Sequence, residues 1–363
     1  MKILHVITSL YTGGAERLMV DLLPRLTDGG KNQIELLLLN GVETPFKQLL
    51  TQQGIKIHCL SMTNDVYSPR KLFAVRRFLS TNHYDIIHTH NTACQLFVPL
   101  AHQWKRLDGV LVTTEHSSTN RRRSHWWLQW LDKWMYSRYD AIVCIADKAK
   151  DNLEEYTGRT ENVITINNGV DISRFIRPIK DISCNDSFVV TMVAALRIEK
   201  DHGTLLKAIK RLPQNYSLRI VGGGPHEVAD SVKKMCNELK LDARVSFLGL
   251  RQDIPDILEQ SDINVLSSHW EGLSLSSIEG MASGRPFIAS DVDGLREVVG
   301  GAGVLFSHGD EKDLADKIQW LCEHPDEYRR VALQCQEKAR QYDISETANR
   351  YIELYKKLCH THK

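Results

Sequence analysis

The sequence has no paired cysteines and no cysteine motif. Its eight cysteines stand singly along 363 residues, and none forms a CxxC. Disulfides persist in oxidising compartments, whereas scattered single cysteines in a chain of this length are typical of reduced core thiols. We therefore expect a cytoplasmic protein, and neither a disulfide framework nor a cysteine-based metal site.

Long apolar segments and net charge are missing as well. No uninterrupted run approaches the ~18 apolar residues of a transmembrane helix, and the apolar start at residues 1–8 is interrupted too early for a signal peptide. Lysine and arginine exceed aspartate and glutamate by 46 to 45. This balance predicts no general attraction to nucleic acid, so any preference for an anionic surface must come from a local patch.

Strand-like and helix-like segments alternate from the first residue onward. This alternation predicts an α/β protein whose parallel sheets are doubly wound, with helices on both faces, and 363 residues suit two domains. The expected strands are 2–7, 34–39, 55–60, 85–88, 110–114, 141–145 and 163–166 in the first half, and 188–194, 218–221, 245–248, 263–266 and 287–289 in the second.

A turn-forming segment separates the two halves. Asn167–Asp171 is rich in turn residues, and the chain to Asp186 is polar and interrupted by proline. We expect an N-terminal domain over 1–170, a C-terminal domain over 171–340, and a final helix over 341–363 that packs back on the N-terminal domain. The predicted architecture is two Rossmann-like halves that face each other across a cleft.

The stretch 261–299 carries the first candidates for chemistry. Its expected strand ends at Leu266 and is followed by Ser267-Ser268, Glu271 lies in the loop after it, and a helix that starts near Ser274 contains Glu279. Ligands of open α/β sheets bind just outside the carboxyl ends of the strands, and Glu271 lies at such a place.

Two glycine loops lie between a strand and a helix, one in each half. Gly13-Gly14 follows the first strand, and Gly222–Pro225 follows the strand that ends at Val221. Such loops let backbone N–H groups and a helix N-terminus face a phosphate, although a simple tight turn would use glycine too. Neither loop reads GxGxxG, so a dinucleotide site is poorly supported. Together they favour a phosphorylated ligand.

Three histidines follow neighbouring strands. His88 and His90 share one face of a strand and imitate metal ligands, but no partner completes a recognisable set. We favour His116, at the end of the next strand, as a hydrogen-bonding group toward a polar substrate. The pair Asp291 and Asp293 resembles a metal-binding DxD, but helix capping by Asp293 explains it more simply. No metal is expected.

A basic and aromatic segment runs from Arg121 to Trp134. Trp127, Trp130, Leu131 and Trp134 share one face of the helix expected over 126–138. Packing of this face into the first domain is the favoured interpretation. The alternative is a surface, including the arginines at 121–123, that contacts an anionic membrane or a lipid-linked acceptor.

The assembly resembles the retaining family 4 glycosyltransferases, which have the GT-B fold, over nearly the whole chain. The segment 271–286 looks like the E-x7-E motif of that family. Supporting motifs occur in the family's order, namely Gly13–Arg17, Asn168–Asp171, Glu199–His202, Gly222–Pro225 and Glu297–Val299.

The resemblance implies the roles of the candidate residues. Glu271 would lie at the transferred sugar, near the backbone amides of Gly272 and Leu273, and the two oxygens of Glu279 would accept hydrogen bonds from the ribose hydroxyls. Lys200 would stabilise the leaving diphosphate. The other donor-side residues are then Gly13, Gly14, Gly223, Ser274 and His116, and the acceptor-side residues are Glu16, His90, Arg121 and Arg122.

Two positions depart from the family pattern, and one of them is Asp293, where many relatives carry glycine. The usual arginine five residues before Lys200 is replaced by Ala195, and Arg197 is the nearby substitute. The implied mechanism needs no metal, because Lys200, Arg197 and helix N-termini can stabilise the charge on the diphosphate. Same-face attack would retain the anomeric configuration, and whether Glu271 becomes a transient nucleophile stays open.

The resemblance also implies the substrates. The expected donor is a nucleotide sugar, with a UDP-sugar preferred, and the expected acceptor is a surface glycan or its lipid carrier, which makes the inner face of the membrane an alternative location. A 2-epimerase for sugar nucleotides and a nucleotide-sugar-binding protein without turnover are the alternatives. A nicotinamide-dependent oxidoreductase is less supported, because both glycine loops lack its fingerprint.

Overall fold

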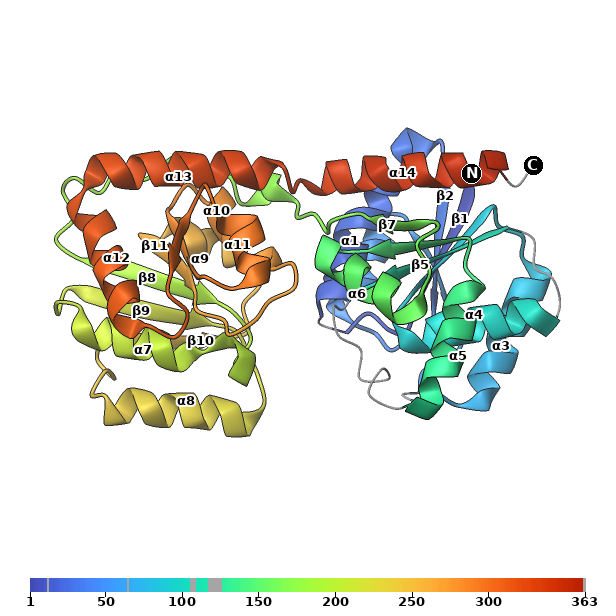
Figure 1. Ribbon diagram of the computed structural model, residues 1–363, viewed down its shortest axis with the longest axis horizontal. Coiled ribbons are helices and arrows are strands. Elements are labelled where there is room, and N and C mark those ends of the chain that lie inside the picture. The colour runs from blue at the N-terminus through green and yellow to red at the C-terminus, as the bar shows by residue number, and fades with distance from the viewer. Residues whose placement is uncertain (12, 64, 105–108, 117–125, 362–363) are drawn as a thin grey trace. The chain divides into compact units, whose positions relative to one another are not determined.

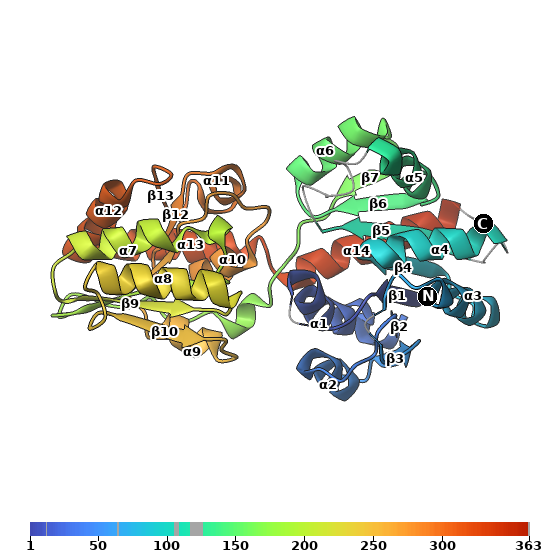
Figure 2. The same cartoon turned by 90° about the horizontal axis from the view of Figure 1, so that it is seen from below.

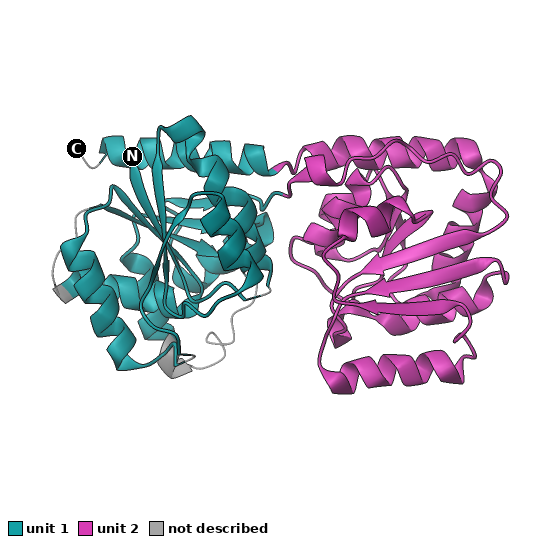
Figure 3. Ribbon diagram, turned by 180° about the vertical axis from the view of Figure 1, so that it is seen from behind, with its two compact units in different colours: residues 1–169, 344–363 teal, residues 170–343 magenta. Residues whose placement is uncertain are grey.

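The computed structural model describes residues 1–11, 13–63, 65–104, 109–116 and 126–361. The chain divides into two compact units, shown in different colours in Figure 3. Unit 1 consists of Met1–Gly169 and Ile344–Lys363, and unit 2 of Val170–Asp343. Each unit contains its own parallel sheet and its own hydrophobic core.

The sheet of unit 1 has seven strands in the order β3-β2-β1-β4-β5-β6-β7, and all pairs are parallel. Helices cover both faces, so the central strands are almost continuously buried, although β4 and β5 carry polar residues toward their carboxyl ends. The strands are β1 (Lys2–Ile7), β2 (Gln33–Leu38), β3 (Lys56–Cys59), β4 (Ile86–His90), β5 (Val110–Glu115), β6 (Ala141–Cys144) and β7 (Val163–Thr165).

The helices of unit 1 pack on the two faces of its sheet. They are α1 (Gly14–Leu26), α2 (Pro45–Gln52), α3 (Pro69–Thr81), α4 (Thr92–Trp104), α5 (Trp126–Ser137), α6 (Asp147–Thr157) and α14 (Ile344–Thr361). One core cluster joins α1 and α14 to one face, and a second joins α3, α4, α5 and α6 to the other. In Figure 1, α14 lies on the side of the sheet away from α3, α4 and α5.

The sheet of unit 2 has six parallel strands in the order β10-β9-β8-β11-β12-β13. The strands are β8 (Phe188–Val193), β9 (Tyr216–Val221), β10 (Val245–Gly249), β11 (Ile263–Leu266), β12 (Phe287–Ser290) and β13 (Val304–Phe306). The helices are α7 (His202–Arg211), α8 (His226–Glu238), α9 (Ile254–Glu259), α10 (Leu275–Ala282), α11 (Asp293–Val299), α12 (Glu311–Glu323) and α13 (Pro325–Arg340). Figures 1 and 2 show α7 and α8 on one side of this sheet, with α10, α11 and α13 on the other.

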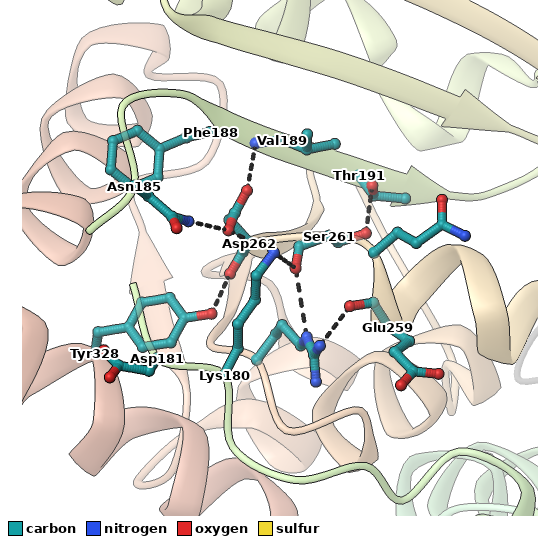
Figure 4. Close-up of polar contacts among 12 residues, drawn as sticks. Lys180, Asp181, Asn185, Phe188, Val189, Thr191, Glu259, Ser261, Asp262 and Tyr328 are labelled. Atoms are coloured by element: carbon teal, nitrogen blue, oxygen red, sulfur yellow. Dashed lines mark hydrogen bonds and ion pairs between the residues drawn. The ribbon is translucent and has the colours of Figure 1, made fainter. Parts of the chain in front are cut away.

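A buried polar network fastens the first segment of unit 2 to its sheet (Figure 4). The carboxylate of Asp262, one residue before β11, accepts hydrogen bonds from the backbone N–H of Val189 at 2.7 Å and from Asn185 Nδ2 at 2.9 Å. It also pairs with Lys180 Nζ at 2.8 Å, while the Tyr328 hydroxyl donates to the Asp262 carbonyl oxygen at 2.8 Å. This network lies at the amino end of the strand, so it supports the sheet from the edge opposite the candidate site.

The structure departs from the expected elements at a few points. The three-residue strand β13 was not predicted, because Val304–Phe306 is too short to show a period. His90, which the sequence left between strand and loop, is the last residue of β4. Helix α11 begins at Asp293 itself, so this residue does not occupy the capping position, and its carboxylate pairs with Arg296 at 3.3 Å. Within the described residues, no helix is both long enough and apolar enough to cross a bilayer.

Candidate functional site

The candidate residues of unit 2 gather where its strand order reverses. Strand β8 connects to β9 on one side, and β11 connects to β12 on the other, so the loops after β8 and β11 meet at the switch point of the sheet. Crevices at such switch points are the usual ligand sites of open α/β sheets. Lys200 lies in the first of these loops and Glu271 in the second.

An ion pair joins these two loops. Lys200 Nζ donates to Glu271 Oε1, and the Ser268 hydroxyl donates to the same oxygen at 2.6 Å. The side chains of Lys200 and Glu271 are 19% and 10% exposed, so the pair is only partly screened by water. Among the described residues no donor reaches Glu271 Oε2, which leaves that oxygen able to accept a hydroxyl.

Backbone hydrogen bonds hold the two loops together. The Ser267 hydroxyl donates to the carbonyl oxygen of Asp201 at 2.9 Å, and the His269 N–H donates to that of Glu199 at 2.8 Å. The Ser290 hydroxyl, at the end of β12, donates to the Ser268 carbonyl oxygen at 2.6 Å. Three loops at the carboxyl edge therefore support one ion pair.

Gly294 brings helix α11 against the backbone of the Glu271 loop. A Cβ at this position would lie 2.0 Å from the carbonyl oxygen of Gly272 and 2.5 Å from that of Glu271. No side chain fits in that space, so this close approach requires glycine. Gly272 itself is exposed at the surface of the loop.

Helix α10 follows the Glu271 loop directly. The Ser274 hydroxyl is its N-cap and accepts from the Ser277 N–H at 3.3 Å, in agreement with the helix start expected near Ser274. Leu273 packs against the core, and Glu279 is half-buried in the middle of the helix. Of the two carboxylates of the motif, Glu271 thus lies in a loop and Glu279 in the helix that follows this loop.

The glycine loop after β9 serves close packing of backbone. A Cβ at Gly222 would lie 2.0 Å from the Ala194 carbonyl oxygen, and one at Gly224 would lie 2.1 Å from that of Leu196. The Leu196 N–H donates to the carbonyl oxygen of Gly223 at 2.9 Å. These glycines hold the loop after β9 against the segment that leads from β8 to Lys200.

Arg197 points to a different partner from the one expected. Its guanidinium is 62% exposed and pairs with Glu199 at 3.7 Å. An exposed pair of this kind contributes little energy. The role of Arg197 beside Lys200 stays a prediction.

Unit 1 has its own switch point, between β1 and β4. Gly13 is the N-cap of α1, and Gly14 is its first residue. Glu16, in the first turn, accepts a hydrogen bond from Asn91 Nδ2 in the loop after β4, at 3.4 Å. Burial raises the pKa of Glu16. Gly13, Gly14 and Glu16 therefore line the edge at which a ligand of this sheet would bind.

Four histidines lie near this edge: His5 and His88 within β1 and β4, His90 at the end of β4, and His116 directly after β5. His90 Nε2 lies 2.9 Å from His5 Nδ1, and His90 Nδ1 lies 3.0 Å from His116 Nε2. His88 instead contacts the Tyr355 hydroxyl at 2.6 Å and the Thr114 hydroxyl at 2.7 Å. Desolvation lowers the pKa of His5 to about 3 and that of His116 to about 4, so these rings are neutral at pH 7.

The position of His90 corrects its assigned role. The sequence placed His90 on the acceptor side, but its side chain is fully buried between His5 and His116. A buried ring offers no surface to an acceptor, so any influence of His90 passes through His116. The ligand atoms of His5, His88 and His90 lie within 4.8 Å of one another, but both nitrogens of His88 already have hydrogen-bond partners.

Two family models match the two units in order. Residues 12–174 match one described as Glycosyltransferase Family 4, and residues 187–324 match one described as Glycosyl transferases group 1. This chain is a family 4 glycosyltransferase. Its fold is the two-domain, Rossmann-like GT-B fold.

Individual proteins agree with this assignment. The glycosyltransferase resembles EpsD of Bacillus subtilis (strain 168), with 28% identity over 80% of this chain and 81% of that protein. It is 29% identical to the UDP-Gal:alpha-D-GlcNAc-diphosphoundecaprenol alpha-1,3-galactosyltransferase of Escherichia coli, over 65% of this chain and 64% of that one. The crystal structure of Anabaena HepE in complex with UDP has the same fold, with a TM-score of 0.84 at 24% identity, covering 98% of this chain and 99% of that one.

The basic and aromatic segment of the glycosyltransferase is described only in part. Arg121, Arg122 and the side chain of Trp127 lie outside the described residues. Trp134 packs partly against the core, whereas Trp130 is 69% exposed. The tryptophans of the expected aromatic face therefore have different environments: Trp134 packs inward and Trp130 lies at the surface.

Sequence reasoning missed three residues that shape this glycosyltransferase site. Ser268 was considered only as a residue that ends the strand Ile263–Leu266, Gly294 only as a neighbour of Asp293 before a helix, and His5 not at all. A polar residue inside the apolar run Lys2–Ile7 was the available signal for His5. Nothing in the sequence shows which partner these residues meet.

Proposed function

We propose that this chain is a retaining glycosyltransferase that transfers a sugar from a UDP-sugar to a lipid-linked glycan without a metal ion. The observation that carries the proposal is the ion pair between Lys200 and Glu271 at the switch point of unit 2. A charge pair with little solvent screening at this position suits a reaction in which charge develops on a leaving group.

Lys200 is suited to stabilise the leaving diphosphate. Its ammonium has three N–H donors, and the pair with Glu271 uses one of them. The other two can bind phosphate oxygens while Glu271 keeps the ammonium in place. The positive charge that a metal supplies in other enzymes then comes from a side chain of unit 2.

The two carboxylates take separate roles. Glu271 accepts from Lys200 and Ser268 through Oε1, so Oε2 can accept a hydroxyl of the transferred sugar. Glu279, half-buried on α10, would accept the two ribose hydroxyls of the nucleotide. This division does not require Glu271 to form a covalent bond, and it agrees with same-face attack.

The substrates are proposed from the relatives. The name of the galactosyltransferase from Escherichia coli specifies a UDP-sugar donor and a diphosphoundecaprenol-linked acceptor. A UDP-sugar and a lipid-linked sugar are therefore the pair to test first, within the synthesis of a surface polysaccharide or glycolipid. Such an acceptor would bring the protein to the inner face of the membrane.

Contact with an anionic membrane is proposed for the segment from Arg121 to Trp134. The exposed indole of Trp130 supports it, because tryptophan favours membrane interfaces. Replacement of the arginines at 121–123 by serine should reduce sedimentation with anionic liposomes and leave the nucleotide affinity unchanged. Equal sedimentation of the variant and the parent would refute the membrane contact.

The function is tested by product analysis with and without an acceptor. The purified protein is incubated with UDP-galactose, UDP-glucose or their N-acetyl derivatives, alone and with a short-chain GlcNAc-diphospho-lipid. Release of UDP and growth of the lipid-linked glycan only in the presence of the acceptor would support transfer. Conversion of the sugar nucleotide without an acceptor would identify an epimerase, and binding without turnover would identify a sensor.

A further inference from the structure

A line of three histidines runs through unit 1 from the buried His5 to the partly exposed His116. The two rings of each neighbouring pair have centroids 5.3 Å apart, for His5 with His90 and for His90 with His116. The hydrogen-bonded nitrogens of each pair are only 2.9 and 3.0 Å apart. With the ring centres at 5.3 Å, these nitrogens must lie on the line between the two rings. The rings therefore meet edge to edge, as N–H···N hydrogen bonds require.

Neutral imidazoles in such a line constrain one another. Each neutral ring has one N–H donor and one lone pair, so the ring in the middle donates to one neighbour and accepts from the other. Burial holds the pKa of His90 well below its usual value, which keeps this ring neutral. The line then has two states: in one, every N–H points toward His116, and in the other, every N–H points toward His5.

The two ends of the line decide between these states. His5 Nε2 and His116 Nδ1 are buried atoms that have no hydrogen-bond partner among the described residues. One end must carry an unpaired N–H and the other an unpaired lone pair. His5 is completely buried, whereas His116 keeps partial exposure as a residue at the carboxyl edge of the sheet, so its covered Nδ1 is the end of the line nearer to a ligand oxygen that could accept a hydrogen bond. The N–H therefore belongs at His116, because an orphaned buried donor is rarer than an under-satisfied acceptor.

We propose that His5 and His90 are positioning residues that hold His116 in its Nδ1–H tautomer and orient it as a hydrogen-bond donor to an oxygen of the donor sugar. The sugar contact rests on the proposed function, whereas the tautomer does not. His88 is outside this line, since Tyr355 and Thr114 occupy its two nitrogens.

Three variants of the full chain separate this role from a structural one. His5→Leu removes the hydrogen bond to His90. His5→Asn keeps a donor for this bond, because the side-chain amide nitrogen of asparagine is bonded to Cγ as Nδ1 is in histidine. Thr114→Val is the matched control: it removes a buried hydroxyl that contacts His88 and Tyr351 in the same layer and leaves the line of three histidines intact.

The direct readout is the tautomer of His116, measured by NMR of protein labelled with ¹⁵N at histidine and assigned with His116→Gln. We expect the Nδ1–H form in the parent, in His5→Asn and in Thr114→Val, and a mixture of both forms in His5→Leu. An Nε2–H form in the parent, or one unchanged tautomer in His5→Leu, would overturn the proposal. Stoichiometric Zn²⁺ binding that His5→Leu abolishes would overturn it too, because the histidines would then be ligands.

Kinetics provide the second readout. His5→Leu should lower kcat for transfer about tenfold, which corresponds to one hydrogen bond of about 1.4 kcal/mol. The Kd for UDP should not change, because the proposed nucleotide contact at Glu279 lies in unit 2. His5→Asn should recover most of the rate, and an equal loss in both His5 variants would refute positioning. If the parent transfers no sugar, the proposed function fails, while the tautomer measurement still decides this inference.

Discussion

Substitution of Gly294 by alanine should lower the catalytic rate strongly and the stability of unit 2 only slightly. The added Cβ would lie 2.0 Å from the Gly272 carbonyl oxygen, well inside van der Waals contact. The loop that carries Glu271 must then retreat by about 1.4 Å to restore an ordinary contact. A displacement of this size in a catalytic geometry can lower the rate by about 100-fold.

The effect on stability is smaller because two terms oppose each other. Overpacking costs about 1–3 kcal/mol, while alanine is favoured over glycine in a helix by about 0.5–1 kcal/mol. A net loss of about 1 kcal/mol would lower the melting temperature of a unit of this size by roughly 2–4 °C. We therefore expect kcat for transfer to fall about 100-fold in a protein that stays folded at assay temperature.

Gly203→Ala is the matched control for this experiment. Gly203 is the second residue of α7, as Gly294 is the second residue of α11. Its Cβ would meet Met235 Sδ at 3.4 Å and Asp201 Oδ1 at 3.6 Å, which are ordinary contacts. This variant should keep its kcat and gain slightly in stability. Parental kcat and melting temperature in Gly294→Ala would refute the close packing of α11 on the Glu271 loop.

Four further predictions follow from the site and from the buried histidines. Lys200→Ala should abolish transfer at an unchanged melting temperature, and near-parental turnover would contradict its role at the leaving group. Glu279→Ala should mainly raise the KM for the donor. If only kcat fell, Glu279 would act at the reacting bond rather than at the ribose. Activity should persist in EDTA, whereas a requirement for Mn²⁺ would refute the metal-free mechanism. The free energy of unfolding should decrease as the pH drops below 6.5, because histidines of the unfolded chain bind protons that the buried neutral rings do not. The expected decrease is about 1.4 kcal/mol per pH unit for each ring. With the pKa of His5 lowered to about 3, His5→Asn should reduce the slope of unfolding free energy against pH between 6 and 5.

Local sequence patterns predicted most elements of the fold. The apolar run Ile263–Leu266 and the amphipathic helix Gly14–Leu26 are marked by their own residues and by the turn residues beside them, so the local sequence is enough to identify them. Val304–Phe306 was missed, because three residues form a strand only when a neighbouring strand pairs with them. The two glycine loops were located by their place between strand and helix, but the close backbone contacts of Gly222 and Gly224 depend on Ala194 and Leu196 in another segment of the chain.

The α/β class, the order of the motifs and the two carboxylates of the candidate site were predictable, because each depends on residues close together in the chain. Which of these groups meet depends on the packing of distant segments. Lys200 and Glu271 are 71 residues apart, and they pair because β8 and β11 are neighbours at the switch point. His5 and His90 are 85 residues apart and meet because β1 lies beside β4. Strand order brings these side chains together, and strand order follows from the packing of whole sheets rather than from any local pattern.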